Sequence, residues 1–199
     1  MLIGGKSMPT IQSTPYRWPW NGLFDMRDFA LVVTSAMVAN QDSERITQND
    51  RNLLRNFADT VRDAGALVVE VACSDPRITD VPWRTGDKSA LSIGERFTDA
   101  DIHLQSCGID AFYSSPLENV LNRSHRRLIG LCGTWFETSV HSTMREANDR
   151  GMECVVFHDI SFCLDPQSKK NTISQIEMSG GIFGVVSTST DFSKTFCHC

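Results

Sequence analysis

The chain has 199 residues, of which 41% are hydrophobic and 22% are charged, a composition typical of one folded domain and not of a disordered or fibrous protein. Its 19 lysines and arginines against 24 aspartates and glutamates give a net charge of −5, and without a basic run we expect no nucleic-acid partner. No apolar stretch reaches membrane-spanning length and the N-terminus lacks a signal peptide's apolar core, so we expect a cytoplasmic protein with no membrane partner.

The first 28 residues are expected to form an extended N-terminal arm. The arm has no helical or alternating period. It is interrupted by Pro9, Pro15 and Pro19, and Tyr16, Trp18 and Trp20 lie among these prolines. Aromatic rings of this kind need a surface to pack on. That surface is either the chain's own domain or a neighbouring subunit.

Beyond residue 28, apolar runs of strand length alternate with amphipathic helical patterns. We expect buried strands at 29–34, 66–72, 101–105, 127–133, 153–157 and 182–186. Helices are expected at 42–64, from 115 onward and at 136–150. This alternation predicts βαβ units, and therefore a three-layer α/β/α, Rossmann-like domain over residues 29–192 with a mainly parallel sheet of about six strands. Residues 193–199 are expected to be a C-terminal tail.

Three of these segments carry more detailed expectations. The helix at 42–64 has one apolar face, formed by Ile46, Leu53, Leu54, Phe57, Ala58, Val61 and Ala64. Ser115 is the expected N-cap of the next helix, with Pro116 in its first turn. The polar stretch 74–92 is long for a loop within a compact domain, and such loops are often functional.

The seven cysteines, at positions 73, 107, 132, 154, 163, 197 and 199, include no C-x-x-C pair. We expect them to be reduced and buried, without disulfides. Cys197-His198-Cys199 suggests a metal ligand set, but three residues at a frayed terminus give poor geometry. We expect no metal site and no cofactor.

In a parallel sheet, ligands bind outside the carboxyl ends of the strands, and one such end carries a family motif. Residues 131–147, followed by Asp149-Arg150-Gly151, resemble the core motif of isochorismatase-like cysteine hydrolases, roughly L-x-G-x-x-T-N-V-C-V-x-S-T-x-R-E-A-x-D-R-G. Residues 111–117 are similar to the family's S-A-F-x-G-T-x-L stretch. Residues 15–22, P-Y-R-W-P-W-N-G, look like the leader of the ureidoacrylate and biuret hydrolase branch.

The resemblance implies an isochorismatase-like fold and an Asp–Lys–Cys triad that cleaves amide or urea C–N bonds. Aligned with the family motifs, the Asp, Lys and Cys positions hold Ser35, Ser106 and Ser139. The family's metal-binding Asp/His pattern is also unmatched, because no histidine follows Cys73-Ser74-Asp75-Pro76 until His103.

Residues around the three serines are candidates for binding a small polar ligand, namely Gln105, Phe112, Trp135, Phe136, Glu137 and Thr138. Trp135 and Phe136 would narrow the pocket. Ser139 is expected to satisfy backbone N–H groups at a helix N-terminus. As a nucleophile it would need an adjacent base; Glu137 could approach, whereas His141, about 200° further around a helix, should point away.

Three functional interpretations stay open. The first is a non-hydrolytic pseudoenzyme that binds a small molecule or serves as a subunit of a homo-oligomer, a dimer or tetramer as family members commonly are, or of a hetero-oligomer with an active paralogue. The second is an enzyme with repurposed chemistry. The third is an amide or urea hydrolase with Ser139 as nucleophile and Glu137 assisting.

Overall fold

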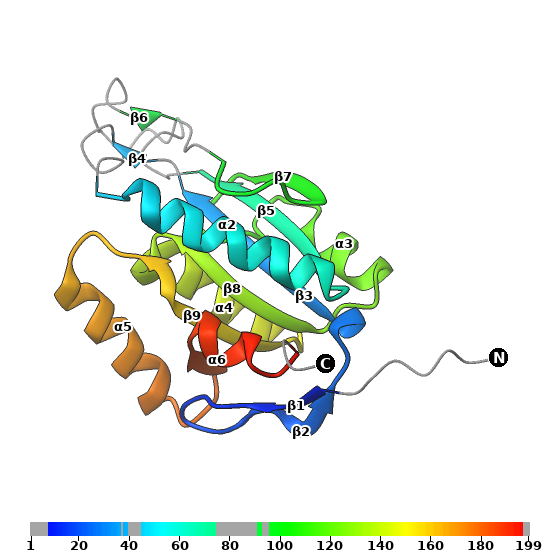
Figure 1. The fold of residues 1–199 in the computed structure, drawn as a ribbon. Coiled ribbons are helices and arrows are strands. Elements are labelled where there is room, and N and C mark those ends of the chain that lie inside the picture. Colours follow the sequence, from blue (N-terminus) through cyan, green and yellow to red (C-terminus); the bar gives the residue numbers. More distant parts are fainter. Residues whose placement is uncertain (1–7, 37, 40–44, 75–90, 93–95, 197–199) are drawn as a thin grey trace.

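The computed structural model describes residues 8–36, 38–39, 45–74, 91–92 and 96–196, and its fold is shown in Figure 1. Six strands form one sheet in the order β10-β9-β8-β3-β5-β7, and every neighbouring pair is parallel. These strands are β3 (Phe29–Ala36), β5 (Leu67–Cys73), β7 (Ile102–Ser106), β8 (Leu128–Thr134), β9 (Glu153–Phe162) and β10 (Val185–Ser187). The predicted three-layer α/β architecture is confirmed.

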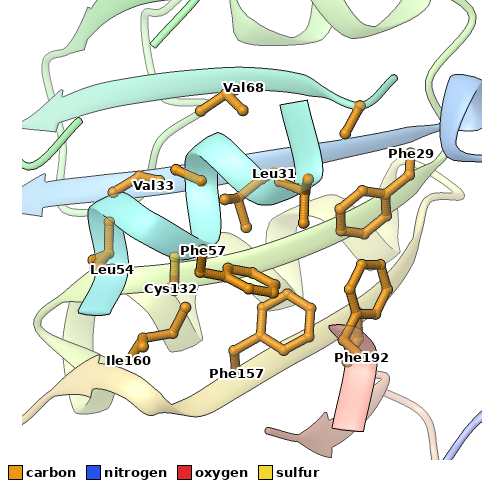
Figure 2. Close-up of a cluster of buried hydrophobic side chains, with 14 of the residues drawn as sticks. Phe29, Leu31, Val33, Leu54, Phe57, Val68, Cys132, Phe157, Ile160 and Phe192 are labelled. Atoms are coloured by element: carbon orange, nitrogen blue, oxygen red, sulfur yellow. The ribbon is translucent and has the colours of Figure 1, made fainter. Parts of the chain in front are cut away.

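Helices cover both faces of the sheet, because the strands carry apolar side chains on both faces. On one face, α2 (Gln48–Asp63) and α6 (Ser189–Ser193) pack on a cluster that includes Phe29, Leu31 and Val33. Figure 2 shows this cluster, in which the Phe29 and Phe192 ring centroids lie 4.8 Å apart. On the other face, α3 (Leu117–Arg123), α4 (His141–Asp149) and α5 (Pro166–Met178) contribute to a second cluster. The apolar runs of the sequence are therefore strands buried on both sides.

The N-terminal arm packs on its own domain. It forms β1 (Met8–Ile11) and β2 (Trp18–Phe24), which pair antiparallel, and the 3-10 turn η1 (Met26–Asp28). Trp18 is fully buried, with its ring centroid 5.5 Å from that of Phe24 and 6.0 Å from that of Phe29. By contrast, Trp20 on the same strand is 76% exposed. A second short antiparallel pair joins β4 (Val38–Ala39) to β6 (Leu91–Ser92).

The structure corrects several sequence expectations. Helix α2 begins at Gln48 because Thr47 and Asp50 form a capping box there, and residues 42–44 lie outside the described part. The inward placement of Leu53 was wrong, since its side chain is 48% exposed. Strand β10 begins at Val185 rather than at residue 182.

Smaller differences concern α3 and the cysteines. Helix α3 begins at Leu117, although the Ser115 hydroxyl does accept the Leu117 N–H at 3.2 Å. Five cysteines are described and all are free, but Cys107 is exposed, so its predicted burial was wrong. Residues 197–199 and most of the predicted loop at 74–92 lie outside the described residues. None of the helices described is long and apolar enough to cross a membrane.

Candidate active site

The three serines predicted at triad positions all lie at the carboxyl-end edge of the sheet. Ser35 is near the end of β3, where its neighbours in register are Ala72 of β5 and Thr134 of β8. Ser106 is the last residue of β7, and Ser139 lies in the π-helical turn η3 (Phe136–Val140) that follows β8. Each serine is at most 2% exposed. The parallel register therefore places all three where such sheets bind ligands.

The hydroxyl groups of two of these serines interact with the backbone. The Ser106 Oγ donates to the carbonyl of Gly108 at 2.9 Å, and the Ser35 Oγ makes a long contact, 3.5 Å, with the carbonyl of Val71. Among the described residues, no hydrogen bond joins any two of the three hydroxyls. A backbone carbonyl is not a base, so neither of these two contacts activates its hydroxyl as a nucleophile.

The thiol of Cys73 lies near the hydroxyls of Ser106 and Ser139, and its own hydrogen bond goes to the carbonyl of Val71 at 3.7 Å. The sequence did not identify Cys73 as a site residue. It is the last residue of β5, directly beside Ser106 in register, and it is 1% exposed. Burial raises the pKa of its thiol to about 12, while the nearby hydroxyls of Ser106 and Ser139 act in the opposite direction. At neutral pH Cys73 is therefore a protonated thiol, and a thiol in that form is a poor nucleophile.

The turn from β8 into α4 is fixed against β3. Gly133 adopts φ +111°, and a Cβ there would lie 2.1 Å from the carbonyl oxygen of Thr34, so only glycine fits. The Thr34 hydroxyl donates to the carbonyl of Thr134 at 3.0 Å, just before a cis peptide bond between Thr134 and Trp135. This turn sets the position of Ser139 relative to the central strand.

Ser139 does not cap a helix, contrary to expectation. Neither η3 nor α4 has a side-chain cap, because the π turn continues directly into α4 and leaves Ser139 inside the helical segment. Its carbonyl accepts the Thr143 hydroxyl at 2.6 Å, and that hydroxyl in turn accepts the N–H of Ala111 at 2.9 Å. The backbone at Ser139 is thus tied to the segment that follows β7.

The two sequence neighbours considered as bases for Ser139 bond elsewhere. The Glu137 Oε1 accepts the Leu164 N–H at 2.9 Å, whereas its Oε2 is buried and has no hydrogen-bond partner among the described residues. The buried His141 ring accepts a hydrogen bond from the Arg145 Nε at 3.4 Å. Neither side chain hydrogen-bonds with Ser139 in the part of the chain that the structure describes.

The predicted ligand-binding residues divide by exposure. Gln105 and Thr138 are exposed, and Glu137 is partly exposed. Phe136 is fully buried in the second hydrophobic cluster and Phe112 is 5% exposed in the same cluster, whereas Trp135 belongs to the first cluster at 7%. The three aromatic rings are therefore part of the hydrophobic core, with Trp135 in a different cluster from Phe112 and Phe136. Only the polar side chains are accessible.

Within the described residues, no three histidine, cysteine, aspartate or glutamate side chains gather closely enough to hold a metal ion.

A protein-family model described as an isochorismatase domain matches residues 25–191. The chain belongs to the isochorismatase family. Solved structures of this family and of related hydrolases share its fold. A cysteine hydrolase from Pseudomonas syringae pv. phaseolicola 1448A is 13% identical, with 94% of this chain and 96% of that chain covered and a TM-score of 0.68.

Two further structures extend this comparison. An isochorismatase family protein from Burkholderia thailandensis is 22% identical, covering 95% of this chain and 98% of that one, with a TM-score of 0.60. A nicotinamidase from Bacillus subtilis is 15% identical, covering 79% and 97% respectively, with a TM-score of 0.62. At such identities the structural likeness establishes the isochorismatase fold and leaves the chemistry to the site itself.

Proposed function

We propose that this isochorismatase-family protein is a non-hydrolytic pseudoenzyme, which binds a small polar molecule or serves as a subunit of an oligomer. The observation that carries the proposal is the presence of Ser35, Ser106 and Ser139 at the positions that the family motifs assign to the aspartate, lysine and cysteine. Three neutral hydroxyls there supply neither a proton acceptor, nor a cation, nor a thiolate.

The surroundings of the three serines support the proposal. A seryl hydroxyl becomes a nucleophile only when an adjacent base removes its proton. Glu137 hydrogen-bonds with Leu164, and His141 with Arg145. The thiol that lies near the hydroxyls of Ser106 and Ser139, that of Cys73, has a pKa raised to about 12 by burial. None of these groups provides the missing chemistry at neutral pH.

The finer assignments are part of the same proposal. Residues 15–22 resemble the leader of the ureidoacrylate and biuret hydrolase branch, and this resemblance supports a small amide-like molecule as the ligand. Exposed Gln105 and Thr138 are the polar groups suited to hydrogen-bond such a ligand. A homo-oligomer, or a hetero-oligomer with an active paralogue, is the assembly in which an inactive subunit of this family would be retained.

Covalent labelling tests the proposal directly. The protein is incubated with a panel of ureas, amides and nicotinamide, quenched in acid, and its intact mass measured, with Ser139→Ala as the matched control. We expect unmodified protein in both samples. An acyl adduct that maps to Ser139 and disappears in Ser139→Ala would establish a serine hydrolase instead.

Restoring the triad tests whether only three side chains have been lost. The triple variant Ser35→Asp, Ser106→Lys and Ser139→Cys is assayed for hydrolysis of the same panel, with circular dichroism to verify its fold. Hydrolysis is expected if the surrounding pocket is intact. A folded but inactive triple variant would show that the pocket itself has been remodelled.

A further inference from the structure

We propose that a hollow lined by Tyr16, Trp20 and Glu153 binds a small organic cation that carries a quaternary or methylated ammonium group. The hollow lies where α4 ends and β9 begins, which is the amino-end edge of the sheet. The three serines lie at the opposite, carboxyl-end edge. Figure 1 shows β1 and β2 at the end of the molecule away from β4 and β6. The site is thus separate from the one described above.

Two aromatic rings form a corner of the hollow. The ring centroids of Tyr16 and Trp20 lie 5.0 Å apart, and the ring planes meet at 81°. Trp20 is 76% exposed, so its indole is free to contact a ligand. Aromatic faces attract cations through their quadrupole, and perpendicular aromatic walls are the arrangement that surrounds a methylated ammonium group.

Glycine makes room for the Tyr16 ring. A Cβ at Gly181 would lie 2.8 Å from the Cε1 of Tyr16, and Gly181 has φ +98°. One edge of the ring, at Cδ1 and Cε1, therefore lies close to a backbone that carries no side chain at that point. The backbone of Tyr16 is held by Ser13, whose hydroxyl donates to the Tyr16 carbonyl at 2.6 Å.

Glu153 supplies a negative charge that has no cationic partner within the described residues. Its Oε1 accepts the backbone N–H of Trp20 at 2.6 Å and lies 3.5 Å from the Tyr16 hydroxyl. Its Oε2 makes no hydrogen bond with a described residue, and Glu153 is one of the residues that line the hollow. Burial raises the pKa of this carboxyl group, as expected where positive charge is missing.

The composition of the hollow selects the ligand class. Its volume of about 410 Å³ lies in the range of small-molecule sites. A single carboxylate is too few oxygen ligands for calcium or magnesium, and it repels anions. One carboxylate beside two aromatic walls is instead complementary to a charge that is spread over methyl groups.

Calorimetric titration tests the proposal with choline and its uncharged isostere, 3,3-dimethyl-1-butanol. We expect choline to bind and the isostere to bind at least about ten-fold more weakly, because it fills the same volume without the charge. Failure of choline to bind at tens of millimolar would overturn the proposal. So would equal binding of both compounds, which would identify a merely apolar hollow.

Variants locate the binding. Trp20→Ala and Glu153→Gln should each weaken choline binding by about ten-fold or more; glutamine keeps an oxygen to accept the Trp20 N–H while removing the charge. Tyr113→Ala removes another exposed aromatic ring, and Asp149→Asn removes an exposed carboxylate outside the lining. Both controls should bind as the native protein does. Binding unchanged in Trp20→Ala or Glu153→Gln would contradict the site.

Discussion

At the scale of the residue, we expect His141 to make the protein less stable in acid. Burial first and the nearby Arg145 second lower its pKa from an ordinary 6.5 to about 4. The neutral ring accepts the Arg145 Nε and contacts Phe183 edge to face, with ring centroids 5.9 Å apart. A protonated ring cannot accept that hydrogen bond, so acid must charge a group that the fold holds neutral.

The sign of the pH dependence follows from this shift. Between pH 6.5 and 4 the unfolded chain binds more protons at this site than the folded protein, so stability falls as pH falls through that range. We expect the free energy of unfolding to fall by about 1–2 kcal/mol. This is less than the full pKa shift implies, because solvent screens part of the interaction. Urea unfolding at pH 7 and pH 4 measures this loss of stability.

The matched variant for this prediction is His141→Gln, which should show a smaller loss between the two pH values. Part of the loss should remain, because burial also lowers the pKa of His158. His125→Gln, at an exposed position, should behave as the native protein does. An unchanged pH dependence in His141→Gln would contradict this role for the buried ring.

Glu70 carries a second prediction at this scale. The side chain is 2% exposed in the middle of β5, and its carboxylate accepts the N–H groups of Phe97 and Thr98 and the Thr98 hydroxyl, at 2.8–3.0 Å. Glu70→Gln replaces one carboxylate oxygen, which accepts hydrogen bonds, by an amide NH2 group, which donates them. That group would face the donors of Phe97 and Thr98. We expect this substitution to reduce the free energy of unfolding by about 1–3 kcal/mol in urea. Glu146→Gln, at the surface ion pair with Arg150, should cost under about 0.5 kcal/mol.

At the scale of the element, β2 fixes the N-terminal arm through one of its two tryptophans. Trp18 is fully buried among Phe24, Phe29 and Phe192, whereas Trp20 is 76% exposed. Trp18→Ala should destabilise the protein by about 3–5 kcal/mol, because it empties a site in the core. Trp20→Ala should change stability by about 0.5 kcal/mol at most. Thermal and urea unfolding measure the stability of both variants. Equal losses of stability would show that Trp18 is not the residue that holds the arm.

The elements also show what the sequence could predict. Strands buried on both faces read as unbroken apolar runs, so β3, β5, β8 and the first half of β9 were predicted close to their bounds. Helix starts depend on side-chain caps that a periodic pattern does not record, which is why the capping box at Thr47 was missed. The exposure of Leu53 likewise depends on how far α2 is rotated against the sheet.

The site was predictable in part. A sheet's topology brings the ends of β3, β7 and β8 to one edge, so the shared location of the three serines followed from the motif and the fold. The position of Cys73 beside Ser106 depends on the register of β5 against β7, which no local pattern gives. Cys107 is exposed because the chain turns directly after Ser106. In this turn the backbone N–H of Cys107 donates to the Tyr113 carbonyl at 3.0 Å.

At the scale of the whole molecule, scaffold and chemistry are separable. The two hydrophobic clusters that hold the layers of the isochorismatase fold together contain none of the three serine side chains. A family fold of this kind can therefore persist while its reactive groups change. Our central proposal, the absence of hydrolysis, concerns only the side chains at the carboxyl-end edge of the sheet.

The most direct test is ammonia release from nicotinamide and a series of ureas and amides by the native protein and by Ser139→Ala, at equal concentration and with folding verified. We predict no release above the buffer rate from either protein, because no described base hydrogen-bonds with Ser139 and the Cys73 thiol is protonated. Release by the native protein that Ser139→Ala abolishes would contradict the proposal.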